Sequence, residues 1–300
     1  MKAIVHPSQS PARVEVQRAD CLRQRSIAAK FHYETPRQAE LWLKLHAQYA
    51  PPSDVTAPYE AAAKALADTW PHSDGALIAI GCGGGEKDLT ILKALPKNTE
   101  FIPTDVSEPL ALKSAEAIPK AKPLVFDLAT AKDLPMFLDQ HTGLNRIYTF
   151  FGIIPNFPPH EILPQLRALL KPEDRLLFSA NLAPDGITSI LPQYDNAPTR
   201  EWLSEFPRTH GAGKGEVKIK IERDGPLDRI AANFYFTETC TMNANDKQFD
   251  FIAGDILRLF VSYRYTLQSL AETLASHNIV IENAFLSNSG EEGVFVCALQ

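Results

Sequence analysis

The stretch of sequence that decides the fold is ALIAIGCGGGEKD, residues 76–88. Its first five residues, 76–80, are all apolar, which is typical of a short buried strand, and four glycines stand within the next five positions. A helical pattern then runs through Leu89, Leu92 and Leu95. Glycine lets a backbone turn tightly and approach a ligand closely, and a helix that begins there offers free N–H groups. The stretch therefore predicts a site for a nucleotide-type ligand, with a plain strand–turn–helix junction as the alternative.

The spacing of the glycines narrows the choice of ligand. Gly81, Gly83 and Gly85 form G-x-G-x-G, whereas the dinucleotide fingerprint G-x-G-x-x-G would require a glycine where Glu86 stands. An acidic residue at that position would repel a pyrophosphate. It suits a cationic ligand that carries an α-amino group and a sulfonium, and S-adenosylmethionine is such a ligand. The spacing favours this cofactor over a nicotinamide dinucleotide.

The bulk composition is that of an ordinary globular protein with one large domain or two closely associated ones: 300 residues, 45% hydrophobic and 22% charged. The net charge is −6 and no basic block stands out, so a nucleic-acid partner is not expected. The four cysteines have no metal-binding or redox spacing, which predicts a reduced, cytoplasmic protein without a metal. Residues 1–10 lack a signal-peptide core and no apolar run reaches about 18 residues, so no membrane association is expected.

Strands and helices alternate along the middle of the chain, which predicts a parallel sheet with right-handed crossovers. The expected strands cover residues 76–80, 100–104, 123–126, 146–150 and 175–181, and the expected helices cover 86–95, 108–117, 132–140 and 159–170. A helix over 266–276 and strands over 278–286 and 293–299 would close the sheet. Ligands bind outside the carboxyl ends of the strands in such a sheet.

The remaining segments predict a second domain. Residues 18–70 and 186–206 have helical patterns, and two or three antiparallel strands are expected in 216–223, 230–240 and 248–262. The fold class is thus α/β: a Rossmann-like sheet of the class I methyltransferase type, mostly parallel with an antiparallel last strand, beside an α+β substrate or lid domain. The expected cofactor domain comprises 71–185 plus 263–300, the substrate domain comprises 18–70 plus 186–262, and 1–17 is an irregular N-terminal tail.

Two acidic residues follow the second and third expected strands. An acid at the position of Asp105 can accept both ribose hydroxyls of a nucleoside cofactor, and one at Asp127 can accept from an adenine amine. Each has a structural alternative, because Asp105 could cap the next helix and Asp127 could be a capping or turn residue. The glycine loop and the two acids follow three successive strands. Together they indicate a nucleoside cofactor site more specifically than any one of them does alone.

Two further segments carry polar groups toward the expected site. Lys87 opposes the helix macrodipole, which favours a pairing with the carboxylate of the cofactor's methionine part, although a solvated lysine is the alternative. The loop at residues 150–159 would face the methyl group that is transferred, with Phe151 against the cofactor. Asn156 in this loop offers a donor and an acceptor to an amine or carboxylate, with a turn asparagine before prolines as the alternative.

In these motifs the chain resembles the histidine-specific, S-adenosylmethionine-dependent N-methyltransferases of ergothioneine biosynthesis and their relatives that act on tryptophan-derived amines. The similarity covers about residue 30 to the end, and its motifs are AIGCGGGEK (79–87), FIPTDVS (101–107), FGIIPNF (151–157), ANLAPD (180–185), YDNA (194–197) and SYRYT (262–266). The resemblance implies that Gly81, Lys87, Asp105 and Asp127 hold S-adenosylmethionine. It also implies a two-part architecture.

The same resemblance assigns substrate residues. It implies that Asn156 and Tyr194, the catalytic candidates, hold the amino-acid backbone of a substrate, with Tyr49 near the pocket. The structural alternatives are a half-buried tyrosine for Tyr194 and a packing role for Tyr49.

Two positions depart from the family pattern. Pro155 replaces the glycine before the loop asparagine, which stiffens the loop. Phe260 stands two residues before Ser262, where the histidine enzymes carry a glutamate, and its alternative role is core packing. We therefore expect an N-methyltransferase for a small amino-acid-like substrate other than histidine. The alternatives are a non-catalytic nucleoside-binding or regulatory protein that keeps the fold, and a nicotinamide-linked oxidoreductase, which Glu86 disfavours.

Overall fold

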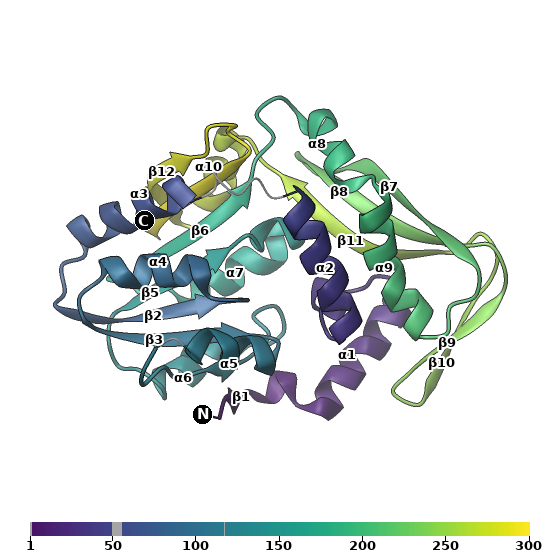
Figure 1. Cartoon of the computed structure of the whole chain (residues 1–300), viewed down its shortest axis with the longest axis horizontal. Helices are drawn as coiled ribbons and strands as arrows, with labels where there is room; N and C mark the ends of the chain where they lie inside the picture. The colour runs from purple at the N-terminus through teal and green to yellow at the C-terminus, as the bar shows by residue number, and fades with distance from the viewer. Residues whose placement is uncertain (1, 50–55, 117) are drawn as a thin grey trace. The chain divides into compact units, whose positions relative to one another are not determined.

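The structure, a computed structural model, describes residues 2–49, 56–116 and 118–300 (Figure 1). The chain forms two compact units. Unit 1 comprises Met1–Ser10, Pro52–Pro184 and Tyr265–Gln300, and unit 2 comprises Pro11–Pro51 and Asp185–Arg264. No helix in the described ranges is both long enough and apolar enough to cross a membrane.

Unit 1 is built on an eight-stranded sheet, counted over the described residues, with the order β1-β4-β3-β2-β5-β6-β13-β12. Strands β1 to β6 pair in parallel, whereas β13 runs antiparallel to both β6 and β12. The sequence-based expectation of a mostly parallel sheet with an antiparallel last strand is confirmed. The strands are β1 (Ile4–Val5), β2 (Asp74–Ile80), β3 (Asn98–Asp105), β4 (Leu124–Val125), β5 (Arg146–Phe151), β6 (Arg175–Asn181), β12 (Ile279–Leu286) and β13 (Glu292–Leu299).

The helices of unit 1 cover the sheet, and alternate apolar residues of its strands pack on opposite faces. Leu77 and Ala79 of β2 pack in one cluster with buried residues of α3, α4 and α5, and Ile78 between them points to the opposite face. The helices are α3 (Thr56–Thr69), α4 (Glu86–Ala94), α5 (Glu108–Glu116), α6 (Leu134–Asp139), α7 (Pro159–Leu169) and α10 (Leu267–Ala275), with short 3-10 turns η1 (Pro7–Gln9) and η3 (Ile154–Asn156). The glycine loop therefore starts from a central strand that is buried from Gly75 to Ile80.

Two segments differ from the expected domain boundaries. Residues 1–17 are not an irregular tail, because Ile4 N donates to the Pro123 carbonyl at 3.0 Å and adds β1 to the sheet edge beside β4. A two-residue strand leaves no periodic signal in a sequence. Helix α3 belongs to unit 1 and not with the expected substrate domain, since Tyr59 and Leu66 are buried in the sheet cluster.

Unit 2 holds a three-stranded antiparallel sheet in the order β11-β8-β7 and a β9–β10 hairpin. The expected strand over 248–262 is two strands, because Ile252–Asp255 forms a turn. The elements are α1 (Pro11–Gln24), η2 (Ala29–His32), α2 (Pro36–Tyr49), α8 (Ile187–Tyr194), α9 (Ala197–Thr209), β7 (Gly215–Asp224), β8 (Leu227–Phe236), β9 (Cys240–Ala244), β10 (Lys247–Phe251) and β11 (Ile256–Arg264).

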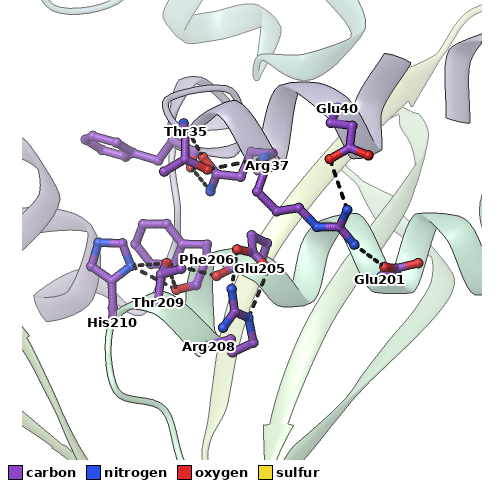
Figure 2. Close-up of polar contacts among 11 residues, drawn as sticks. Thr35, Arg37, Glu40, Glu201, Glu205, Phe206, Arg208, Thr209 and His210 are labelled. Atoms are coloured by element: carbon purple, nitrogen blue, oxygen red, sulfur yellow. Dashed lines mark hydrogen bonds and ion pairs between the residues drawn. The ribbon is translucent and has the colours of Figure 1, made fainter. Parts of the chain in front are cut away.

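Helix α9 is bound to α2 by an ion pair at the surface, and its aromatic side chains pack on the turn η2. Figure 2 shows Arg37 between Glu40 of its own helix and Glu201 of α9, at 3.1 and 2.9 Å. These side chains are roughly half exposed, so the ion pairs contribute little to stability. The buried Trp202 and Phe206 of α9 carry the packing.

His32 is a fully buried part of that packing. Its Nε2 lies 2.7 Å from the Leu259 carbonyl, its ring lies beside Trp202, and burial lowers its pKa to about 4. The imidazole is therefore neutral in the folded protein at neutral pH. Its contribution to stability is present above about pH 6.5 and is lost as the pH falls toward 4.

Candidate functional site

The glycine loop leaves an open space beside Gly83 and Gly84. A Cβ atom added at Gly81 would lie 2.1 Å from Ile153 Cδ1, and one added at Gly85 would lie 2.2 Å from Ser114 Oγ, so these side chains would have to shift; φ values of +63° and +78° also favour glycine at both positions. No atom of the described residues lies within 4 Å of a Cβ built at Gly83 or Gly84. Helix α4 begins at Glu86, directly after this space, and its N-cap residue Gly85 has no side chain to cap the N–H groups of the first turn. The loop therefore has the room that a cofactor needs.

Asp105 fixes the shape of this loop. Its carboxylate accepts from Gly83 N at 3.1 Å with one oxygen and from Ser107 N at 2.9 Å with the other. The side chain is buried, and this burial raises the pKa of the carboxyl above its usual value. Helix α5 begins at Glu108, and Ala111 N donates to the Ser107 carbonyl, so Ser107 and not Asp105 stands at the helix cap. The lone pairs that these N–H groups leave free can accept from ribose hydroxyls.

Replacing Asp105 with alanine is expected to weaken S-adenosylmethionine binding by roughly 1.5–3 kcal/mol, the range for hydrogen bonds to a charged group. Calorimetry on the wild type and on Asp105→Ala measures this change, and Asp105→Asn, which keeps an acceptor for Gly83 N, should lose less. An unchanged dissociation constant together with a lower melting temperature would show that Asp105 only holds the loop.

Asp127 lies at the end of β4 in a tight turn. Its Oδ1 accepts from Ala129 N at 3.0 Å, and its own backbone N donates to Ser8 Oγ at 3.2 Å. Ser8 in turn lies 2.9 Å from Nδ1 of the buried His6, whose Nε2 lies 3.1 Å from Asp133. The turn role that the sequence left open is thus present, and the N-terminal segment helps to position Asp127. No local sequence pattern indicated this segment.

Lys87 is part of a polar cluster at the carboxyl ends of the strands. Its Nζ lies 2.8 Å from the Tyr59 hydroxyl and 3.3 Å from Glu292 Oε1. The buried Tyr59 also bonds Glu292 at 2.5 Å and lies 2.8 Å from Ser179 Oγ. Lys87 is therefore anchored by Glu292 instead of being a freely solvated lysine, although its side chain keeps 38% exposure to meet a ligand.

Phe151 and Asn156 lie in the loop after β5. The Phe151 ring packs edge-on against Tyr59 at 4.9 Å, which places it beside the Lys87 cluster. Asn156 ends the short turn η3, its backbone N donates to the Ile153 carbonyl at 2.9 Å, and its side-chain amide has no hydrogen bond among the described residues. The amide of Asn156 is thus available to a ligand.

Asp88, which the sequence did not single out, is buried in the first turn of α4. Its carboxyl makes a short hydrogen bond with Thr149 of β5, and burial raises its pKa to about 7. No cation pairs with it among the described residues, so its charged form is not favoured in the folded protein. A buried acid directly behind the glycine loop couples the stability of this region to pH.

Asp88→Asn is expected to make unit 1 more stable at high pH. Between about pH 4 and pH 7 the folded state holds a proton on Asp88 that the unfolded chain releases, so the free energy of unfolding falls as the pH rises through this window. The asparagine variant removes that loss, up to about 4 kcal/mol at pH 8 and little at pH 4. Chemical denaturation at several pH values measures the difference, with the exposed first-turn acid Glu108→Gln as the control. A pH-independent difference would contradict the prediction. His32 makes the free energy of unfolding change with pH in the opposite direction, but this contribution is the same in the wild type and the variant. It therefore cancels in the difference between them.

The substrate candidates of unit 2 come together around Tyr194. Its hydroxyl lies 3.2 Å from Ser262 Oγ, its ring stacks on Phe260 at 6.1 Å, and Phe260 meets Trp202 edge-on at 5.9 Å. Arg264, which the sequence analysis did not select, donates a short hydrogen bond to the Tyr194 hydroxyl. The side chain of Tyr49 lies outside the part of the chain that the structure describes.

Comparison with known proteins identifies the class. The model of the family described as histidine-specific, S-adenosylmethionine-dependent methyltransferases matches residues 17–204, which is more than half of the chain. The chain belongs to this family, and its cofactor is S-adenosylmethionine. The open glycine loop, the anchored Lys87 and the buried Asp105 fit that cofactor. No curated protein sequence matches the chain.

The fold is shared with the first of three similar solved structures. The structure of OxaC in complex with SAH and oxaline is 14% identical with a TM-score of 0.51, over 89% of this chain and 52% of OxaC. The chain thus spans about half the length of OxaC. DesVI from Streptomyces venezuelae is 14% identical with a TM-score of 0.45, over 89% of this chain and 100% of DesVI. The CcbJ methyltransferase from Streptomyces caelestis is 15% identical with a TM-score of 0.43, over 84% of this chain and 97% of CcbJ.

Proposed function

We propose that this protein transfers a methyl group from S-adenosylmethionine to an amine nitrogen of a small amino-acid-like molecule other than histidine. Unit 1 would hold the cofactor and unit 2 the substrate. The observation that carries the proposal is the position of Phe260, which packs on Tyr194 beside Ser262 and gives this polar cluster an apolar wall.

The cofactor supplies a methyl group on a sulfonium, which is a good leaving group. The protein's task is then to align a neutral amine with that methyl, and alignment alone can contribute about 7–11 kcal/mol to the lowering of the barrier. Asn156, whose amide makes no hydrogen bond among the described residues, would orient the amine or carboxylate of the substrate. Tyr194 would hold the substrate, and Lys87 would meet the carboxylate of the cofactor.

Labelled S-adenosylmethionine tests the reaction directly. The purified protein is incubated with the cofactor and a panel of L-amino acids and arylethylamines, and products are identified by mass spectrometry. We expect N-methylated product from at least one apolar member. Cofactor binding by calorimetry without transfer to any member would support a non-catalytic nucleoside-binding protein instead.

Asn156→Ala is expected to lower turnover by about 10- to 100-fold and to leave S-adenosylmethionine affinity nearly unchanged, because one or two hydrogen bonds to the substrate are lost. Steady-state kinetics and calorimetry measure the two quantities. Asn283→Ala, at an exposed position of β12, serves as the control and should change neither. An equal loss of cofactor affinity would place Asn156 with the cofactor.

A further inference from the structure

Arg264 is a buried arginine at the end of β11. Arg264 is only 6% exposed, and its Nε is buried without a hydrogen-bond partner among the described residues. The guanidinium donates to the Tyr194 hydroxyl and lies over the Tyr194 ring, 5.1 Å from its centre. A hydroxyl and a ring face do not neutralise a guanidinium, which stays charged at every physiological pH.

Two other arginines of the chain have the carboxylate partner that Arg264 lacks among the described residues. Arg146, which is 1% exposed, forms a short ion pair with Asp139, and Arg229 pairs with Glu222 and Asp224. Arg264 has no ion pair within residues 2–49, 56–116 and 118–300. The acid opposite Arg264 on β8 is Asp228, and its carboxylate lies 3.5 Å from the guanidinium of Arg223. A buried charge without a counter-charge is costly, so an anion is expected beside Arg264.

The neighbours of Arg264 define the shape of that ligand. Phe260, Ser262 and Arg264 alternate along β11 and therefore share one face of the strand. Tyr194 contacts all three, through its ring with Phe260 and through its hydroxyl with Ser262 and Arg264. An apolar ring thus stands at one end of this cluster and a cation with two hydroxyls at the other. A guanidinium fork matches the two oxygens of a carboxylate.

We propose that Arg264, with the hydroxyls of Tyr194 and Ser262, binds the carboxylate of the substrate, so that the substrate is an α-amino acid with an apolar side chain and not its decarboxylated amine. This inference rests on the proposed function and deepens it. Arg264 selects between two classes of substrate that the rest of the cluster does not distinguish. The apolar side chain lies toward Phe260 and the carboxylate toward Arg264.

Matched pairs of probes test the proposal by binding alone. L-phenylalanine is compared with phenethylamine, and L-leucine with 3-methylbutylamine, by calorimetry on the full chain saturated with S-adenosylhomocysteine. We expect the wild type to bind each acid at least about 30-fold more tightly than its amine, because a charge-assisted bidentate pair is lost with the carboxylate. Arg264→Gln should remove this preference and Arg264→Lys should keep part of it, while Arg223→Gln should leave it unchanged.

Three results would overturn the proposal. The first is that the wild type binds the amines as tightly as the acids. The second is that Arg264→Gln still prefers the acids. The third is that Arg264→Gln also loses affinity for S-adenosylhomocysteine, which would assign the anion to the cofactor. Because the wild-type comparison needs no variant, a misfolded Arg264→Gln protein does not remove the test. Methyl transfer to the amines alone would refute the inference and leave the proposed reaction intact. Binding of the acids that depends on Arg264, without methyl transfer, would support the inference and refute the proposed reaction.

Discussion

Gly83→Val is expected to lower S-adenosylmethionine affinity at least 100-fold while the protein still folds. The Gly83 backbone has φ +52°, in the left-handed region, and no atom in the described part of the chain lies within 4 Å of the position that a Cβ would occupy. The added Cβ therefore meets no atom of the described residues, and the branched side chain would extend into the space beside the loop where the cofactor's amino-acid part is expected. Isothermal calorimetry on the variant and the wild type measures the affinity.

The control for this variant must carry the same backbone strain. Gly225 in the β7–β8 turn has φ +58° and also has nothing within 4 Å of an added Cβ. Gly225→Val therefore pays the same conformational cost, about 1–2 kcal/mol, without obstructing the loop. Both variants should lose a similar amount of thermal stability, and only Gly83→Val should lose the cofactor. Equal affinities in the two variants would mean that the cofactor does not approach Gly83.

The parts of the fold that repeat a simple pattern could be predicted from the sequence. Each βα unit from Asp74 to Asn181 alternates a short apolar run with a helical one, and a parallel sheet buries both faces of its strands. The glycine spacing and the acids after the second and third strands fall at the ends of these strands, so the position of the candidate cofactor site followed from the same pattern.

The interactions that the sequence did not predict join residues far apart in the chain. Tyr59 and Lys87 meet Glu292 of β13, more than 200 residues away from Lys87, and no local spacing relates them. No sequence motif singled out Asp88, and its burial beside Thr149 of β5 is a property of the folded chain. The N-terminal strand was missed because its two residues pair through their backbone alone.

The same limit applies to the cluster of unit 2 that comprises Tyr194, Phe260, Ser262 and Arg264. The resemblance selected Tyr194, Phe260 and Ser262 because they stand in family motifs, and the structure brings these three together. It gave no reason to select Arg264, which lies inside a matching motif but is distinguished only by its burial and its missing counter-charge. Burial of a charge is a property of the folded chain, so a sequence pattern cannot report it.

Histidine is expected to be a poor substrate, with kcat/KM about 10²- to 10⁴-fold below that of the best apolar amino acid. The imidazole would face Phe260, and a phenyl ring neither accepts its N–H hydrogen bond nor balances its charge. A polar group left unpaired in a buried site costs about 1–3 kcal/mol, and sites that depend on such a bond discriminate by up to about 10⁴-fold. Competition between histidine, phenylalanine and leucine for limiting enzyme measures the ratio.

Phe260→Glu should shift this selectivity toward histidine by at least about 10-fold, because a carboxylate can accept from the imidazole and balance its charge. Phe260→Leu is the matched control, since it shortens the side chain but keeps it apolar, and it should continue to reject histidine. Phe260 is buried beside Trp202, so a circular dichroism melt must show that the glutamate variant is folded before its kinetics are interpreted. Efficient methylation of histidine by the wild type would refute the role of Phe260. A Phe260→Leu variant that accepts histidine as well as Phe260→Glu would show that volume, and not the carboxylate, sets the selectivity.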